Sequence, residues 1–262
     1  MSDAETRWHG VNLAVACLAI CPDLLGGLWV KARIGPVRDQ IEKGLKTALQ
    51  SHTCRRISPL IADEALFGGL DLAATLDTGT MTRTAGLLDT SDVLFLPMAE
   101  RLDAGLTARL CQALDHQRIA LIAYDEGAEP GEQIPNALAD RLALHVDLSN
   151  HPMAEAPDLC FDVEALAEAR ARFSRITLPK GTVESVTETA LRLGILSLRA
   201  PLQALAVAKA SAALLGADHV EEPDLVTAIE LVLAPRATVL PDVSPEETQK
   251  SGDSPPSHED QT

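Results

Sequence analysis

The residues of this chain that could hold a phosphate group lie between a short apolar segment, 28–33, and an amphipathic segment, 36–50. We expect a strand and a helix there, because Pro36 suits the first position of a helix and Gly35 suits the turn before it. A helix that begins just after a strand presents free N–H groups and a positive dipole end to an anion. The spacing therefore predicts either a phosphate-binding loop or an ordinary turn between a strand and a helix.

This candidate loop departs from a working phosphate loop, which has the pattern G-x-x-x-x-G-K-[ST]. Arg38 stands where a lysine should reach the phosphates, and Asp39 stands where a hydroxyl should hold Mg²⁺. A carboxylate at that position faces the negative charge of the nucleotide, and Pro36 removes one backbone donor. The residues that would line the degenerate loop are Arg33, Gly35, Arg38 and Asp39. We expect this loop to be non-functional in ATP binding.

A second nucleotide signature, an apolar strand that ends in Asp-Glu, is also incomplete. The apolar run Val93–Leu96 is typical of a buried strand, but Pro97 and Met98 follow it. Neither of these side chains can bind Mg²⁺ or activate a water molecule. Two incomplete signatures, each at the right place in an α/β chain, are more informative together than either one alone.

Other reactive side chains show no spacing that would assign them a chemical role. The seven histidines lack the spacing of metal ligands, and the five cysteines include no Cys-x-x-Cys pair, so we expect no metal site in this chain. The acids Asp125 and Glu126, with Glu129 and Glu132 after them, are more typical of a solvated loop than of a metal site. Scattered cysteines in odd number favour a reducing compartment, the cytoplasm.

The charge balance excludes some classes of partner. The net charge is −16, and nucleic-acid affinity rests on cationic contacts to phosphate, so we expect no nucleic-acid partner. The same charge disfavours an anionic membrane surface. The apolar stretch 11–21 is too short to span a bilayer and follows Asp3 and Glu5 rather than a basic cluster. We therefore expect a buried N-terminal helix and no targeting signal.

The elements that must position the candidate residues alternate between strand and helix. Apolar runs predict further strands near 56–57, 119–124 and 142–148, and an amphipathic pattern predicts a helix at 104–115. This alternation predicts an α/β fold with a mostly parallel sheet and helices on both faces.

After about residue 160 the pattern becomes purely helical. The predicted helices cover 163–175, 182–194, 200–215 and 222–234. We therefore expect an α/β domain over 1–160, a small all-α helical domain over 161–238, and a disordered, acidic, proline-rich linker over 239–262.

Three parts of the sequence resemble the AAA+ subunits of magnesium chelatase. Residues 66–79 followed by 86–88 are similar to the family pattern G-x-L-D-[IL]-x-x-x-L-x-x-G … G-L-L-A. Residues 29–39 look like the degenerate loop of the D subunits of bacteriochlorophyll-making bacteria. Residues 232–237 are similar to the end of the helical domain in those subunits. The resemblance covers about residues 8–240.

The resemblance implies an AAA+ fold and a three-part enzyme that inserts Mg²⁺ into protoporphyrin IX at the expense of ATP. In that family the I subunit is the ATPase, the H subunit holds the porphyrin, and the D subunit is an AAA+ platform that couples the two. It implies that this chain is a non-hydrolysing member of an oligomeric ligase, with the I and H subunits as partners. Mg²⁺ and ATP would be used by the complex, with no cofactor held tightly by this chain. The D subunit continues into an integrin-I-like domain, so the resemblance also implies a fragment.

Three other functions compete with this one. A MoxR-like AAA+ ATPase is disfavoured by Pro97 and Met98, because an active ATPase needs acids there. A plain interaction scaffold is disfavoured by the family pattern in residues 66–88. A cobalt chelatase subunit is a close relative that the sequence excludes less firmly.

Two arginines are carried over from the family as functional candidates. Arg141, in the segment 138–142, matches the arginine finger, which neutralises charge on a neighbouring subunit's γ-phosphate. The alternative for Arg141 is a local surface pair with Asp140. Arg199, in the segment 197–201, matches the sensor arginine of the helical domain, and its alternative is a salt bridge between domains.

Overall fold

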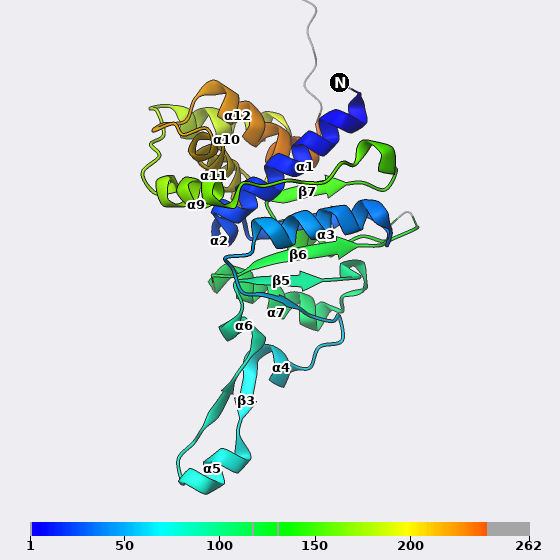
Figure 1. The fold of residues 1–262 in the computed structure, drawn as a ribbon, viewed down its shortest axis with the longest axis vertical. Coiled ribbons are helices and arrows are strands. Elements are labelled where there is room, and N and C mark those ends of the chain that lie inside the picture. Colours follow the sequence, from blue (N-terminus) through cyan, green and yellow to red (C-terminus); the bar gives the residue numbers. More distant parts are fainter. Residues whose placement is uncertain (1, 117, 130, 240–262) are drawn as a thin grey trace, which may run out of the picture.

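The computed structural model describes residues 2–116, 118–129 and 131–239 (Figure 1). At its centre is a five-stranded parallel sheet with the strand order β2-β5-β6-β1-β7. The strands are β1 (Gly27–Lys31), β2 (Cys54–Arg56), β5 (Val93–Leu96), β6 (Ala120–Asp125) and β7 (Leu144–Asp147). Each lies within two residues of the strand predicted from its apolar run, so the α/β fold with a parallel sheet is confirmed.

Helices cover both faces of this sheet, because successive strand residues point to opposite faces. The even-numbered residues of β6 from 120 to 124 belong to one hydrophobic core, and residues 121 and 123 belong to a second. The first core includes residues of α1 (Asp3–Ile20) and α3 (Pro36–Ala48), and the second includes residues of α7 (Ala104–His116) and α8 (Asn136–Ala139).

The N-terminal helix α1 links the sheet to the helical part of the chain. It contacts α3 on the sheet, and also α9 and α11 of the helical part (Figure 1). Its residues from 14 to 20 are all buried, which confirms the buried helix predicted for this stretch. Within the described ranges, no helix is both long enough and apolar enough to cross a membrane.

The helical part packs around α11, most of whose side chains are buried. Its helices are α9 (Val163–Phe173), α10 (Thr182–Arg192), α11 (Arg199–Leu214) and α12 (Glu222–Ala228). The predicted helical segment 222–234 is helical throughout, but its type changes: after Ala228 the chain forms a π-helical turn, η3 (Ile229–Leu233), and then a 3-10 turn, η4 (Ala234–Arg236). Pro235 has no N–H and cannot continue an α-helical ladder. The division at 160/161 stays a prediction, and residues 240–262 of the predicted linker lie outside the described residues.

A slender arm projects from the body on the side of β5 and α7, and the sequence pattern did not predict it (Figure 1). It is built from α4 (Asp63–Phe67), β3 (Gly68–Leu70), α5 (Leu72–Thr78), β4 (Arg83–Ala85) and α6 (Leu87–Thr90), with β3 and β4 antiparallel. Its base depends on two glycines of the family pattern. Gly68 has φ +76°, and a Cβ on Gly86 would lie 2.4 Å from the Gly68 nitrogen. The pattern thus encodes a close backbone crossing that side chains would prevent.

The remaining short elements are α2 (Pro22–Leu25), η1 (Ala99–Arg101) and η2 (Met153–Glu155). The first of these leads directly into β1, and η1 follows β5 at the carboxyl edge of the sheet.

Candidate functional site

The two groups of candidate residues lie at opposite edges of the parallel sheet. The degenerate loop follows β1 at the carboxyl edge, whereas Arg141 precedes β7, and Asp115 lies near the end of α7, just before β6, at the amino edge. The six residues of β6 rise by about 3.3 Å each, so the two edges are roughly 20 Å apart. Arg141 and Arg199 therefore cannot reach the loop of their own chain.

At the carboxyl edge, Arg38 is buried in an ion pair instead of pointing toward a ligand. Its Nη1 lies 2.5 Å from Glu126 Oε1, and only 4% of the residue is exposed. Its guanidinium also stacks over the Tyr124 ring, 4.3 Å from the centroid. The position of the missing lysine is thus occupied by a cation that already has an anion of its own chain.

The carboxyl end of β6, next to the Arg38–Glu126 pair, forms further hydrogen bonds within the chain. Asp125 is fully buried, accepts a hydrogen bond from Trp29 Nε1 at 3.1 Å, and accepts another from the Gly127 N–H. Glu126 N–H donates to Glu100 Oε2 at 3.0 Å. The interpretation of Asp125 and Glu126 as a solvated acidic loop is wrong, because both carboxylates are paired with groups far away in the sequence.

The end of β5 offers no acid in the place of the missing Asp-Glu pair. Met98 has φ +50°, a left-handed conformation that is uncommon for a residue other than glycine. This turn leads into η1, in which the Glu100 carboxylate accepts a hydrogen bond from the backbone N–H of Glu126. Among the described residues, no cluster of three or more His, Cys, Asp or Glu side chains could hold a metal ion.

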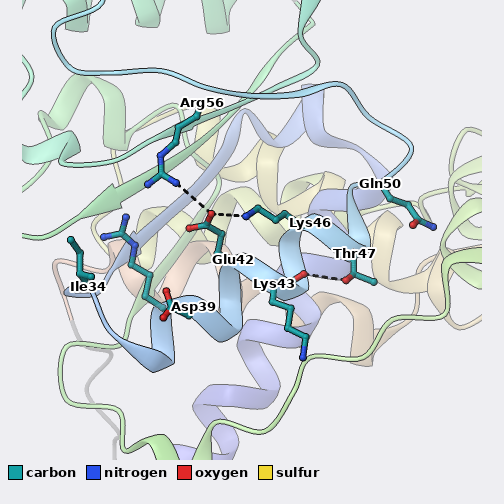
Figure 2. Close-up of a pocket in the computed structure, with 9 residues that line it drawn as sticks. Ile34, Asp39, Glu42, Lys43, Lys46, Thr47, Gln50 and Arg56 are labelled. Atoms are coloured by element: carbon teal, nitrogen blue, oxygen red, sulfur yellow. Dashed lines mark hydrogen bonds and ion pairs between the residues drawn. The ribbon is translucent and has the colours of Figure 1, made fainter.

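The other residues of the degenerate loop lie at the surface. Arg33 and Asp39 are exposed, and Gly35 caps α3 without a side-chain hydrogen bond. Beside them is an open hollow of about 720 Å³, in which Glu42 lies between Lys46 and Arg56 (Figure 2). Burial raises the pKa of Glu42, but the hydrogen bond and charge of Lys46 outweigh it and hold that pKa below its ordinary value. These cations are already paired, so the hollow is no phosphate cradle.

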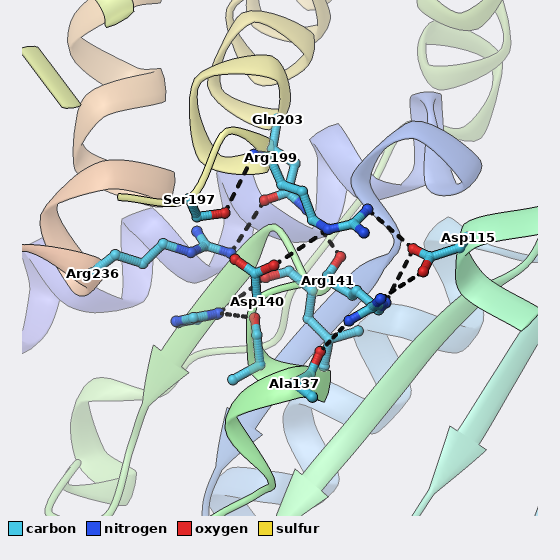
Figure 3. Close-up of polar contacts among 11 residues, drawn as sticks. Asp115, Ala137, Asp140, Arg141, Ser197, Arg199, Gln203 and Arg236 are labelled. Carbon is cyan, nitrogen blue, oxygen red and sulfur yellow. Dashed lines mark hydrogen bonds and ion pairs between the residues drawn. The ribbon is translucent and has the colours of Figure 1, made fainter. Parts of the chain in front are cut away.

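At the amino edge, Arg141 forms a bidentate salt bridge with Asp115 (Figure 3). Arg141 Nε donates to Asp115 Oδ1 at 3.0 Å and Nη2 donates to Oδ2 at 2.5 Å, while Nη1 donates to the Ala137 carbonyl. The hydrogen bond from Arg141 is the main cause that lowers the pKa of Asp115, and it raises the pKa of Arg141 in turn. The expected local pair of Arg141 with Asp140 is not formed.

Arg199, at the first position of α11, joins the same carboxylate. Its Nη1 lies 3.0 Å from Asp115 Oδ1, and its Nε lies 3.3 Å from Asp140 Oδ2. The two candidate arginines, 58 positions apart in the sequence, thus converge on Asp115. Arg199 forms the salt bridge between the α/β and helical parts that its alternative interpretation predicted, and it remains 44% exposed at its side chain.

Exposed apolar residues lie next to Arg199 in the sequence, and an apolar hollow lies beside Arg141. Leu196, Leu198 and Leu202, next to Arg199 in the sequence, are 89%, 81% and 66% exposed. On the side of Arg141, an open and mostly apolar hollow of about 650 Å³ lies along α7. A partly exposed arginine pair with exposed leucines nearby in the sequence is suited to bind a protein surface that carries an anion.

Sequence reasoning missed the residues that complete both groups. Glu126 was seen only as part of an acidic loop, and Asp115 and Gln203 were not singled out. Glu126 lies 88 positions from Arg38, Asp115 lies 26 positions from Arg141, and Gln203 lies 33 positions from Arg236. No local pattern could have found these pairs, because the fold alone brings them together.

Comparisons with solved structures place this arrangement in a known fold. A crystal structure from Cytophaga hutchinsonii, described as a candidate ATPase, matches with a TM-score of 0.60 and 14% identity over 88% of this chain and 86% of that chain. A full-length MCM homologue from Methanopyrus kandleri matches with a TM-score of 0.58 and 17% identity over 88% of this chain and 55% of that chain. The AAA lid domain family matches residues 183–259. The chain has the AAA+ fold, a parallel α/β domain followed by a helical lid.

Sequence relatives narrow the class further. The chain is 47% identical over 242 residues to the magnesium-chelatase 60 kDa subunit of Cereibacter sphaeroides, which covers 92% of this chain and 43% of that protein. It is 44% identical over 232 residues to the subunit of the same name from Rhodobacter capsulatus, covering 88% and 41%. A magnesium-chelatase 67 kDa subunit from Chlorobaculum tepidum is 25% identical over 97% of this chain and 47% of that protein.

Over the matched region, the chain belongs to the family of the magnesium-chelatase 60 kDa subunits, and the resemblance recognised in its sequence is confirmed. The chain spans about two fifths of the length of these relatives.

Proposed function

We propose that this chain is the AAA+ platform of a magnesium chelatase subunit and that it does not hydrolyse ATP itself. It assembles with an ATPase subunit of the I type and with a porphyrin-holding H subunit, and it couples ATP hydrolysis to the insertion of Mg²⁺ into protoporphyrin IX. Mg²⁺ and ATP are used by the complex, with no cofactor bound tightly by this chain. The cytoplasm is the compartment that we propose for it.

The observation that carries this proposal is the contrast between the two edges of the sheet. At the carboxyl edge, the Arg38–Glu126 pair takes the place of a lysine and a phosphate. At the amino edge, Arg141 and Arg199 converge on one carboxylate and remain partly exposed. Such a chain is suited to give arginines to another subunit's nucleotide rather than to bind its own.

The distance between the two edges of the sheet indicates which subunit's nucleotide the two arginines can reach. Because Arg141 and Arg199 lie about 20 Å from the loop of their own chain, any polyphosphate that they meet belongs to a neighbour. An arginine that reaches across a subunit interface stabilises charge on the transferred phosphoryl group. We therefore assign Arg141 as an arginine finger in trans and Arg199 as a sensor arginine that acts at the same interface.

A reconstituted chelation assay tests this proposal. The protein that contains this chain is mixed with I and H subunits, ATP, protoporphyrin IX and either Mg²⁺ or Co²⁺, and metal insertion is followed by porphyrin absorbance. We expect Mg²⁺ insertion that requires this protein and ATP hydrolysis that requires the I subunit. Co²⁺ insertion with no Mg²⁺ insertion would favour the cobalt chelatase, and ATP hydrolysis by this protein alone would contradict the proposal.

A further inference from the structure

Gln203, a buried residue of α11, forms a hydrogen bond with the backbone of Arg141 (Figure 3). Gln203 Nε2 donates to the Arg141 carbonyl at 2.9 Å, and Gln203 Oε1 accepts from Arg236 Nη2 at 3.2 Å. A carbonyl can only accept and a guanidinium can only donate, so these two partners define which way the amide points. Gln203 therefore links Arg236 to the peptide unit of Arg141.

Arg236 links the end of the helical part, through hydrogen bonds, to the residues just before β7. Its Nη1 donates to the carbonyls of Ala143, at 2.8 Å, and Val232, at 2.7 Å, and its Nη2 donates to the carbonyl of Leu142. Among the described residues, no carboxylate lies within salt-bridge distance of this guanidinium. Burial lowers the pKa of Arg236 to about 10, so the side chain stays charged at neutral pH. Four acceptors on one planar fork give a rigid link that a lysine cannot reproduce.

Gly26 also packs closely against the Arg141 carbonyl. Gly26 has φ +64°, and a Cβ at this position would lie 2.3 Å from the Arg141 carbonyl oxygen. The carbonyl is thus enclosed between Gly26, which leads into β1, and Gln203 of α11. A displacement of α11 or η4 would therefore move the Arg141 peptide rather than be absorbed by free space.

Resting on the proposed role of Arg141, we infer that Gln203 and Arg236 are positioning residues for the arginine finger. Their hydrogen bonds fix residues 141–143 relative to the helical elements α11 and η4. In this way they determine where the Arg141 guanidinium points. Neither side chain touches the neighbour's nucleotide in this scheme. Movement of the helical part would change the contribution of Arg141 to the neighbouring site.

The test uses Gln203→Met, which keeps the side-chain volume but removes both hydrogen bonds, and Arg236→Lys, which keeps the charge but loses the fork. In the assembled complex, we expect each to lower the kcat of the I subunit's ATP hydrolysis about tenfold, because a finger misplaced by a fraction of an ångström loses much of its effect. The KM for ATP should stay unchanged. Amide hydrogen exchange of residues 137–143 should become faster in both variants.

A double-mutant cycle separates positioning from general damage. In an Arg141→Ala background, Gln203→Met should cause no further loss of kcat, because the residue acts only through Arg141. Arg172→Lys is the matched control: it disturbs a guanidinium–carbonyl bond to Ala213 inside the helical part and should leave kcat unchanged.

The outcomes distinguish the positioning role of Gln203 and Arg236 from the finger role of Arg141. An equal loss of kcat from Gln203→Met with and without Arg141, or no loss while Arg141→Ala is impaired, would overturn the positioning role and leave the proposed function intact. If the complex assembled with Arg141→Ala hydrolyses ATP and inserts Mg²⁺ like the wild-type complex, the finger role is wrong and the positioning role is wrong with it.

Discussion

Arg38 lies 2.5 Å from Glu126, and this contact brings together a cation and an anion that are separated by 88 positions in the sequence. The pair occupies the point at which an AAA+ ATPase would place a lysine against a phosphate. Its side chains are 5% and 17% exposed, so the charges are largely removed from water. A carboxylate of the chain itself therefore serves as the partner that a nucleotide would otherwise provide.

The first prediction concerns the stability of this pair. Glu126→Gln removes the charge that compensates the buried Arg38, and breaking a buried pair by changing one partner costs about 3 kcal/mol in the free energy of unfolding. Urea denaturation followed by circular dichroism measures this loss. Asp158→Asn, which breaks the exposed Lys43–Asp158 pair, is the matched control and should leave the midpoint unchanged. Equal midpoints for Glu126→Gln and the wild type would show that the pair contributes nothing.

The second prediction concerns nucleotide binding. We expect the isolated chain to bind Mg·ATP weakly or not at all, because Arg38 is engaged by Glu126 and because Pro97 and Met98 replace the acids that hold Mg²⁺. Isothermal titration calorimetry with Mg·ATP should give no saturable heat at micromolar concentrations. A micromolar dissociation constant would contradict this expectation.

The third prediction concerns Arg141. Removal of a fully acting arginine finger costs roughly 10³–10⁵ in rate, but only some sites of a mixed assembly face this chain. Arg141→Ala should therefore lower chelation and ATPase stimulation by less than that range, while folding and complex formation stay intact. Arg141→Lys should not rescue fully, because a point charge does not reproduce the planar fork.

The control for Arg141 is Arg192→Ala. Arg192 is an exposed arginine of α10 that pairs with Glu188 one turn away and lies outside the Asp115 cluster. This variant should support wild-type chelation. Wild-type chelation by Arg141→Ala as well would leave the Arg141–Asp115 contact as a structural ion pair.

The fourth prediction concerns pH. Burial, followed by the nearby charge of Arg236, lowers the pKa of His145 to about 4 from its ordinary value near 6.5, and its Nε2 contacts the carbonyls of Ala139 and Leu142. Below pH 6.5 the unfolded chain takes up a proton at this residue and the folded chain does not, so stability falls as the pH falls toward 4. Between pH 7 and pH 5.5 this residue alone should cost about 1 kcal/mol in the free energy of unfolding.

His145→Gln tests this prediction, since glutamine does not titrate but can still donate a hydrogen bond. The variant should lose about 1 kcal/mol less than the wild type between pH 7 and pH 5.5 in urea denaturation. The same loss in both proteins would mean that His145 takes up its proton in the folded state as well.

Much of the fold follows from local patterns in the sequence. Buried strands such as Val93–Leu96 are continuous apolar runs, and α3 begins at Pro36 after Gly35, as the residue types predict. The incomplete phosphate loop at Arg38 and Asp39 could also be recognised from the sequence, because it departs from a motif of fixed spacing. The arm at 63–90 was not predicted, because its elements are three to seven residues long and carry little periodicity.

The sequence by itself thus determined the class of fold, the positions along the chain of the strands of the parallel sheet, and the absence of a complete phosphate loop. Only the tertiary structure decided the strand order β2-β5-β6-β1-β7, and with it the convergence of Arg141 and Arg199 on Asp115. The same order placed Glu126 against Arg38. The physical reason is that hydrophobic periodicity and turn preferences act within about one element, whereas ion pairs between distant residues form only after the sheet has fixed which strand ends are neighbours.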